Sequence, residues 1–287
     1  MNPDVRTFFD ESTSNATHLV RDPAGTACAV IDTVLDFDMA SGRTGTTAAD
    51  EVIAYIEGEG LNLQWILESH VHADHLTAAP YFKEKLGGNI GIGENVRMVQ
   101  EVFGAVYNAG ADFAHDGSQF DHLFRDGEEF SIGGLSGRVM MTPGHTPACA
   151  VYIIGDAVFT GDTLFMPDSG TARCDFPKGS AEQLYDSIQK ILSLPDETRV
   201  FINHDYGAGG KRDCAWETTV AEEKKSNIHV GGGKSREEFV KMRTERDATL
   251  SMPRLILPSI QVNMRAGQMP PAEDDGHSYM KLPINRF

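Results

Sequence analysis

The chain has 287 residues, of which 40% are hydrophobic and 23% are charged, the proportions of an ordinary soluble globular protein. This length allows one large hydrophobic core or two modest ones. The formal net charge of −17 argues against nucleic acid as a partner, because a polyanion repels phosphate backbones. An anionic small substrate would need a local basic patch to offset the same charge.

No part of the sequence predicts a membrane or secretory segment. No apolar run approaches the roughly 20 residues that span a bilayer. The first residues lack an apolar stretch and include Asp4, Asp10 and Glu11, which argues against a signal or transit peptide. We therefore expect a cytoplasmic protein without a membrane partner. The four cysteines form no CxxC pair and predict reduced thiols; they are Cys28, Cys149, Cys174 and Cys214.

The predicted elements alternate between strands and helices along the chain. Thr77 is the expected N-cap of the second predicted helix. In chain order we predict a hairpin over 17–36, a helix over 47–60, a strand over 63–69, a helix over 76–88, a strand over 89–93, a helix over 94–108, a β-rich block over 122–165, a helix over 180–194, a strand over 199–205, and charged helices within 219–250.

Two βαβ-like halves, each opening with β-hairpins, predict one α/β sandwich. We expect its core to occupy residues 1–206. Residues 207–287 are expected to form a C-terminal helical and coil extension that packs on the same domain. It begins with the glycine-rich loop 207–214.

A cluster of metal-binding residue types follows the strand predicted at 63–69, in the stretch HVHADH. His70 and His72 are two positions apart, so in an extended segment their side chains point to one side and can bind one ion. Asp74 and His75 come where the chain bends toward a helix, which suits a second ion or support for the first. Imidazole and carboxylate are preferred ligands of both zinc and divalent iron.

Three more candidate ligands end other predicted strands. His145 stands in a Pro-Gly turn, Asp162 follows the strand AVFTG, and His204 follows VFIN. Each of them alone could be an ordinary polar residue at a strand end. Together with the first cluster they predict a metal centre whose seven candidate ligands are His70, His72, Asp74, His75, His145, Asp162 and His204.

The order HxHxDH, then His, Asp and His, resembles the metallo-β-lactamase superfamily over roughly residues 17–206. The resemblance implies an α/β fold of αββα type, with two mixed β-sheets flanked by helices. Among the activities of this superfamily, a nuclease fits poorly with the acidic composition. A non-catalytic relative that binds partner proteins would be free to lose ligands, whereas this chain keeps all seven.

Two branches of the superfamily fit the ligand set equally well. A glyoxalase II-like thioester hydrolase would hold two metal ions bridged by Asp162. A persulfide dioxygenase would hold one Fe(II) per subunit on His70, His145 and Asp162, an arrangement that leaves positions open for substrate and O2. The other four ligands would then be a vacant second site or would support the first: His72, Asp74, His75 and His204.

The residues around the ligands resemble the dioxygenase branch more closely. Arg173 precedes an Asp-Phe pair, His204 is followed by Asp-Tyr, and QVNMRAG (261–267) is similar to the C-terminal Asn-Met-Arg element of that branch. The basic helical domain that ends glyoxalase II is not found. Two features depart from the branch: Cys174 stands where threonine is more familiar, and the loop 207–219 is long.

The resemblance therefore implies an Fe(II)-dependent persulfide dioxygenase, an oxidoreductase that converts glutathione persulfide and O2 to sulfite and glutathione in sulfur metabolism. The alternative is a dinuclear hydroxyacylglutathione hydrolase. A homo-oligomer, in particular a dimer, is expected. The predicted catalytic residues are His70, His145, Asp162 and Tyr206. An anionic tripeptide needs cationic groups in the pocket; the predicted substrate contacts are Arg173, Tyr206, Lys211, Arg212 and Arg265.

Overall fold

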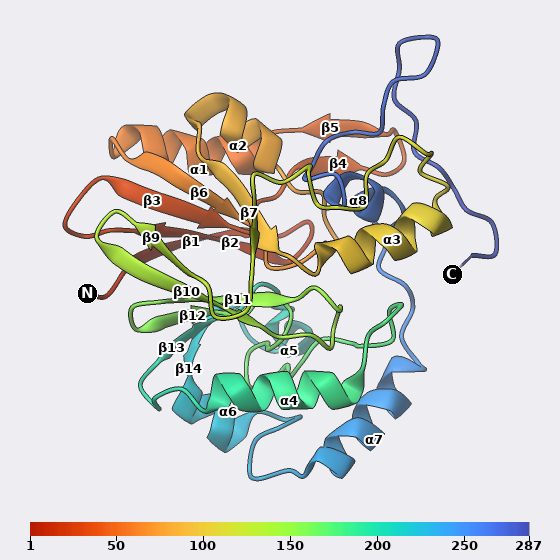
Figure 1. Cartoon of the computed structure of the whole chain (residues 1–287). Coiled ribbons are helices and arrows are strands. Elements are labelled where there is room, and N and C mark those ends of the chain that lie inside the picture. Colours follow the sequence, from red (N-terminus) through yellow and green to blue (C-terminus); the bar gives the residue numbers. More distant parts are fainter. Residues whose placement is uncertain (287) are drawn as a thin grey trace.

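Two six-stranded sheets pack face to face, with helices on both outer faces (Figure 1). The computed structural model describes residues 1–286. The first sheet has the strand order β1-β2-β3-β6-β7-β8, and the second has the order β14-β13-β12-β11-β10-β9. Both sheets contain parallel and antiparallel pairs. The predicted αββα sandwich is confirmed.

The N-terminal half of the chain forms the first sheet and its helices. The strands of this sheet are β1 (Asp4–Asp10), β2 (Asn15–Arg21), β3 (Ala27–Ile31), β6 (Asn62–Leu67), β7 (Asn89–Gly93) and β8 (His122–Phe124). Its helices are α1 (Thr47–Gly58), α2 (Ala79–Leu86) and α3 (Val96–Val106), and a small separate hairpin consists of β4 (Asp36–Asp38) and β5 (Arg43–Gly45).

The second half forms the other sheet and the remaining helices. Its strands are β9 (Glu129–Ile132), β10 (Leu135–Met141), β11 (Ala150–Ile154), β12 (Ala157–Phe159), β13 (Arg199–Phe201) and β14 (Glu217–Thr219). Its helices are α4 (Ala181–Leu192), α5 (Gly207–Gly210), α6 (Val220–Ser226), α7 (Arg236–Asp247) and α8 (Ile256–Asn263).

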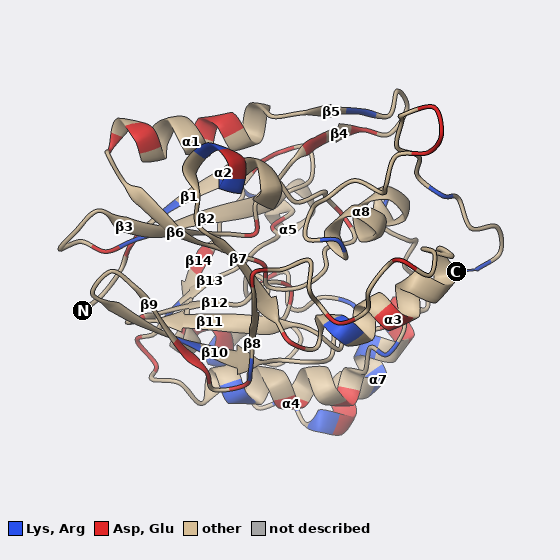
Figure 2. Cartoon of the chain, turned by 45° about the horizontal axis from the view of Figure 1, so that its top comes forward, with Lys and Arg blue, Asp and Glu red and all other residues tan. Residues whose placement is uncertain are grey.

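Three apolar layers hold the sandwich together. The middle layer lies between the sheets and includes Ile31 and Leu67 from the first and Tyr152 and Phe159 from the second. A second layer joins the first sheet to α1, α2, α3 and α8, and a third joins the second sheet to α4 and α7. Strands such as β10 alternate between buried and exposed side chains, as expected where one face meets another sheet. Charged residues colour the outer helices α3, α4 and α7, while the strands are largely uncharged (Figure 2).

Most predicted elements are confirmed, but β1 and β5 were not predicted, and further differences lie after residue 206 and at one cap. Helix α2 begins at Ala79 with Ala78 as N-cap, so the prediction of Thr77 as N-cap was wrong. The Thr77 side chain is buried; its Oγ1 accepts from Ala79 N at 3.1 Å and donates to Glu68 Oε1 at 2.6 Å. The C-terminal stretch is not only helix and coil, because β14 pairs with β13 as the edge of the second sheet. Within residues 1–286, no helix is both long and apolar enough to cross a membrane.

Candidate metal centre

The seven candidate ligands meet at one edge of the sandwich, where strands of both sheets end. His70, His72, Asp74 and His75 lie in the loop after β6 of the first sheet. The other three come from the second sheet: His145 from the loop between β10 and β11, Asp162 from the loop after β12, and His204 from the segment after β13. The two sheets are joined here by the hydrogen bond from Ala150 N to Ser69 O, 2.9 Å long. This edge therefore brings together ligands that are up to 134 positions apart in the sequence, from residue 70 to residue 204.

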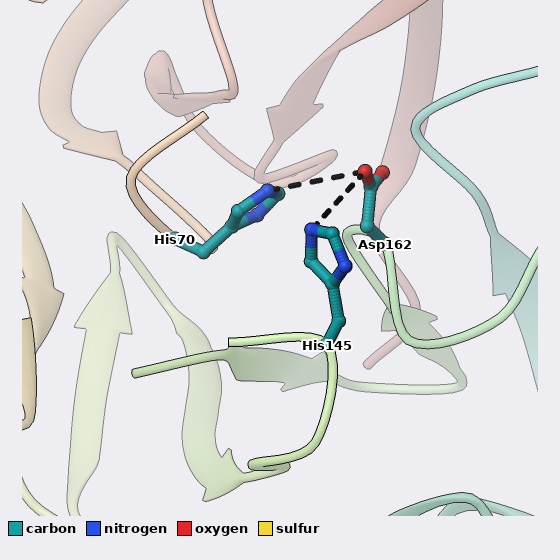
Figure 3. Close-up of side chains that lie close together, drawn as sticks. All are labelled: His70, His145 and Asp162. Atoms are coloured by element: carbon teal, nitrogen blue, oxygen red, sulfur yellow. Dashed lines mark ion pairs between the residues drawn. The ribbon is translucent and has the colours of Figure 1, made fainter. Parts of the chain in front are cut away.

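Three of these side chains converge on one point (Figure 3). His70 Nε2 lies 3.9 Å and His145 Nε2 lies 3.8 Å from the same oxygen of Asp162, Oδ2. Two nitrogen or oxygen ligands that each bind an ion at about 2.1 Å can be at most about 4.2 Å apart. The ligand atoms of His70, His145 and Asp162 are thus close enough to hold one metal ion.

Buried ring nitrogens without partners support a metal at this place. His70 Nε2, His72 Nδ1 and His75 Nε2 are buried and have no hydrogen-bond partner in the described residues. Buried polar atoms are almost always satisfied, so each exception needs an explanation. The imidazoles face one another, with ring centroids 4.1 Å apart for His70–His72 and 4.2 Å for His72–His75. A cation among them would satisfy nitrogens that no protein atom reaches.

A second group of ligands adjoins the first through Asp162. Asp162 Oδ1 accepts from His204 Nδ1 at 2.6 Å, and His204 Nε2 contacts Asp74 Oδ2. The ligand atoms of Asp74, Asp162 and His204 also lie within 4.8 Å of one another, as do those of His72, Asp74 and His75. The site thus has donors for one ion or for two that share Asp162.

The pKa shifts suit metal-ligand roles for His70 and Asp162. Burial lowers the pKa of His70 well below its usual value, and His72 and His145 add to this effect, so the ring is neutral and able to bind metal. Burial alone would raise the pKa of Asp162, but His204 outweighs it and the pKa is lowered. Burial opposes a charge on His204 too, yet Asp162 and Asp74 raise its pKa well above the usual value. Asp162 is therefore a carboxylate whose charge is available at the site.

Two buried carboxyl groups that the sequence analysis missed support His72. Asp32 comes directly after β3. Its Oδ1 accepts from His72 Nε2 at 2.9 Å and from Ser69 N at 2.7 Å. Its Oδ2 accepts from Asn203 Nδ2 at 2.5 Å. Glu68 Oε2 lies 3.4 Å from the same His72 nitrogen. With Nε2 held in this way, Nδ1 is the nitrogen left for a metal ion. Burial lowers the pKa of His72, but the two carboxylates outweigh burial and raise the pKa to about 10, so Nδ1 must lose a proton before it binds an ion. An available signal was that Asp32 and Glu68 also follow buried apolar strands.

Two glycines allow the ligand loops to pack closely. Gly144 has φ 146°, and a Cβ there would lie 2.3 Å from the Leu184 backbone of α4. Gly161 has φ 50°, and a Cβ there would lie 2.5 Å from Ser69 Oγ. Both positions therefore need glycine, one immediately before His145 and the other immediately before Asp162.

The ligands open into a cavity of about 1150 Å³, large enough for a small tripeptide derivative. Asp74, His145 and Asp162 line its floor. Its walls come from the segment 165–176, from the loop after Tyr206 and from the end of α7 with the residues that follow. A second cavity, of about 670 Å³, lies beside α1 and the β4–β5 hairpin and is lined by none of the seven ligands.

Four of the five predicted substrate contacts line the large cavity, namely Arg173, Tyr206, Lys211 and Arg212. Arg265 is not among the residues that line the cavity. The Arg265 guanidinium instead lies over the Phe113 ring and donates to the Gln261 carbonyl. Arg246 and Arg254, which were not predicted as substrate contacts, also line the cavity, from α7 and the segment after it.

Several of these cations are already neutralised. Arg173 forms a two-fold ion pair with Asp175, and Arg212 forms ion pairs with both Asp168 and Asp205. The cavity cations that have no ion-pair partner within residues 1–286 are Lys211, Arg246 and Arg254.

Comparison with known proteins identifies relatives over nearly the whole chain. A probable metallo-hydrolase of Burkholderia pseudomallei is 53% identical, covering 98% of this chain and 99% of the relative. "Glyoxylase B2" of Dictyostelium discoideum is 50% identical, covering 98% and 97%. A β-lactamase hydrolase-like protein of Agrobacterium fabrum is 51% identical over 99% of this chain, which spans only 65% of that longer relative.

Proteins named as persulfide dioxygenases are more distant. The mitochondrial persulfide dioxygenase ETHE1 of Bos taurus is 29% identical, covering 93% of this chain and 91% of the relative. Among solved structures, ETHE1 from Myxococcus xanthus is similar with a TM-score of 0.73 and 33% identity, covering 92% of this chain and all of that one.

The family model of the metallo-β-lactamase superfamily matches residues 12–204, the part of the chain that carries all seven candidate ligands. The chain therefore belongs to the metallo-β-lactamase superfamily.

Proposed function

We propose that the protein is a persulfide dioxygenase that holds one Fe(II) on His70, His145 and Asp162. One glutathione persulfide, one O2 and one water would yield glutathione, sulfite and protons. Bound ferrous iron would supply the redox chemistry that joins O2 to the terminal sulfur. Zinc could not replace it, because zinc has no accessible second redox state. Two neutral imidazoles and one carboxylate would leave further coordination positions open to ligands from the cavity.

The different partners of the two Asp162 oxygens are the observation on which this proposal rests. Oδ2 faces His70 and His145, while Oδ1 is hydrogen-bonded to His204. A carboxylate held in this way presents one oxygen to one ion and uses the other to keep its own orientation. The similarity to ETHE1 in sequence and structure also supports the proposed dioxygenase function.

The chain's own residues would bind the tripeptide through charge. Because Arg173 and Arg212 are engaged by aspartates, we assign the substrate carboxylates to Lys211, Arg246 and Arg254. These three offer a local positive region in a chain whose net charge is −17. In this proposal, Arg173 and Arg212 shape the cavity wall instead.

Tyr206 would stand between the metal ligands and the substrate. Its ring lies nearly parallel to that of His204, with centroids 6.4 Å apart and an angle of 14° between the planes. Its hydroxyl has no hydrogen-bond partner in the part of the chain that the structure describes, and the residue is exposed to the cavity. The hydroxyl can therefore donate to a substrate thiolate or carboxylate.

The second candidate function is hydrolysis of a glutathione thioester at a dinuclear centre. It is favoured by the second set of ligand atoms on Asp74, Asp162 and His204 and by the 50% identity to "Glyoxylase B2". In such a centre Asp162 would bridge the two ions, and its hydrogen bond to His204 would give way to metal ligation.

Oxygen consumption separates the two functions. Iron-loaded protein is expected to consume O2 when glutathione persulfide is added and to release one sulfite for each O2 consumed. Zinc-loaded protein from the same preparation is the control and is expected to consume none. Absence of O2 uptake together with rapid hydrolysis of a glutathione thioester would assign the chain to the hydrolases.

A further inference from the structure

His145 owes its orientation to a backbone carbonyl. Its Nδ1–H donates to Arg173 O at 2.6 Å, which leaves Nε2 facing Asp162. A hydrogen bond of this kind fixes both the tautomer and the ring plane of a metal-binding histidine. The position of the Arg173 carbonyl therefore decides where the His145 ligand atom lies.

The segment that carries this carbonyl has no regular secondary structure of its own. Residues 171–175 lie between β12 and α4 and form neither helix nor strand. Helix α7 holds the segment on both sides of Arg173: Asp247 Oδ2 accepts from Cys174 N at 2.9 Å and from Cys174 Sγ at 3.3 Å. On the other side, Arg243 Nη1 donates to Thr171 O at 3.1 Å.

The two residues of α7 also bind each other. Arg243 Nε donates to Asp247 Oδ1 at 2.8 Å, and both side chains are almost fully buried, 1% and 3% exposed. A buried ion pair contributes little net stability compared with apolar residues of the same volume, because both charges lose their hydration. Such a pair is better explained by the geometry that it imposes on the groups it touches.

We propose that Arg243 and Asp247 are positioning residues for the metal ligand His145. They fix Thr171 and Cys174, and the Arg173 carbonyl between them holds the His145 ring. The inference rests on the metal-binding role of His145 in the proposed function, and it applies whether one ion or two are bound. It also gives Cys174, the residue that departs from the resembled branch, a defined partner in Asp247.

Cobalt binding tests this proposal without reference to catalysis. Co²⁺ is added to metal-free protein, its dissociation constant is measured by competition with a chelator, and its visible absorption reports the ligand geometry. D247A is expected to weaken Co²⁺ binding by about 10-fold to 100-fold, the usual effect of losing an outer partner of a ligand, and to change the absorption bands. D247N is expected to fall between D247A and the wild type, because the amide oxygen can still accept from Cys174 N.

Two further variants separate positioning from general destabilisation. R236A removes the ion pair of 3.1 Å between α7 and Asp186 of α4, which does not touch residues 171–175, and is expected to leave Co²⁺ binding unchanged. R243M/D247L removes the buried charges together, so it avoids an unpaired charge, and is expected to fold yet to bind Co²⁺ as weakly as D247A.

The outcomes are distinct. If R243M/D247L keeps the far-ultraviolet circular dichroism of the wild type and also its Co²⁺ affinity and spectrum, the positioning role is disproved. If the wild type itself binds no Co²⁺, the proposed metal function fails and the inference fails with it.

Discussion

Asp162 and His204 share a hydrogen bond of 2.6 Å between Oδ1 and Nδ1, in the middle of the ligand cluster. This contact lies at the boundary between the two possible metal positions. With the bond intact, His204 orients Asp162 for one ion; with the bond replaced by metal ligation, both residues would hold a second ion. The role of His204 thus distinguishes a mononuclear from a dinuclear centre.

H204A is expected to keep about one iron per chain when the protein is produced with ample iron. The three ligands of the proposed centre are unchanged, although Asp162 loses its orienting partner and turnover should fall by about 10-fold or more. Metal analysis and O2 uptake measure the two effects. H145A is the matched control and should lose the iron. A drop from two tightly bound ions to one in H204A would instead indicate the dinuclear hydrolase.

R246A and R254A are expected to raise KM for glutathione persulfide by about 10-fold each, the effect of one lost charge-assisted hydrogen bond, with kcat little changed. These guanidinium groups have no ion-pair partner in the described chain and line the same cavity as the metal ligands. K241A, on α7 but not in the cavity lining, is the control. A loss of kcat at constant KM would place these arginines in the chemistry rather than in binding.

The sequence was sufficient to predict which seven side chains would come together at this edge, because four of them stand three or four positions after the end of an apolar strand. His70, His145, Asp162 and His204 are polar residues at the ends of apolar runs, and strands of one sheet edge end close together. The fold class followed from the same runs and from the family resemblance. Each of these signals is local in the sequence, and the fold brings the residues that carry them together.

Other features depend on contacts that no local pattern records. Helix α8 was missed because it is short, includes Pro258 and is buried on nearly all sides, so its sequence shows no apolar periodicity. The assignment of Arg212 to substrate did not foresee Asp168, 44 positions away, as its partner. Asp32 resembles any acidic residue that ends a strand until the fold places it beside His72.

D32A is expected to lower both metal affinity and stability. The Asp32 carboxylate is fully buried and accepts from His72, Ser69 and Asn203, so its loss removes an acceptor from three buried donors. The free energy of unfolding should fall by about 3 kcal/mol or more. D22A is the matched control, because Asp22 likewise ends β2 and accepts from backbone N–H groups, of Ala24 and Gly134, far from the ligands.

Chelator competition and thermal unfolding separate the two effects of these variants. D22A should lower the melting temperature and leave the metal dissociation constant unchanged, whereas D32A should change both. Equal metal affinity in D32A and D22A would show that Asp32 serves the fold alone.

Glu223 predicts a pH dependence of stability that is unrelated to the metal centre. Its side chain is fully buried in α6; one carboxyl oxygen accepts from Asn227 Nδ2 at 2.6 Å, and the other has no partner within residues 1–286. Burial raises the pKa of Glu223 from 4.5 to about 8. Between these pH values the folded chain keeps a proton that the unfolded chain releases, so the free energy of unfolding falls as pH rises from 4.5 to 8.

E223Q removes this titration while keeping the side-chain shape and the acceptor for Asn227. The variant is expected to be more stable than the wild type at pH 8, by on the order of 2 kcal/mol, and to lose most of this advantage near pH 5. Urea unfolding at several pH values measures the difference, with E245Q, an exposed position on α7, as control. A constant difference between E223Q and wild type from pH 5 to pH 8 would mean that Glu223 is ionised in the folded protein, and that solvent or a neighbouring cation reaches its second oxygen.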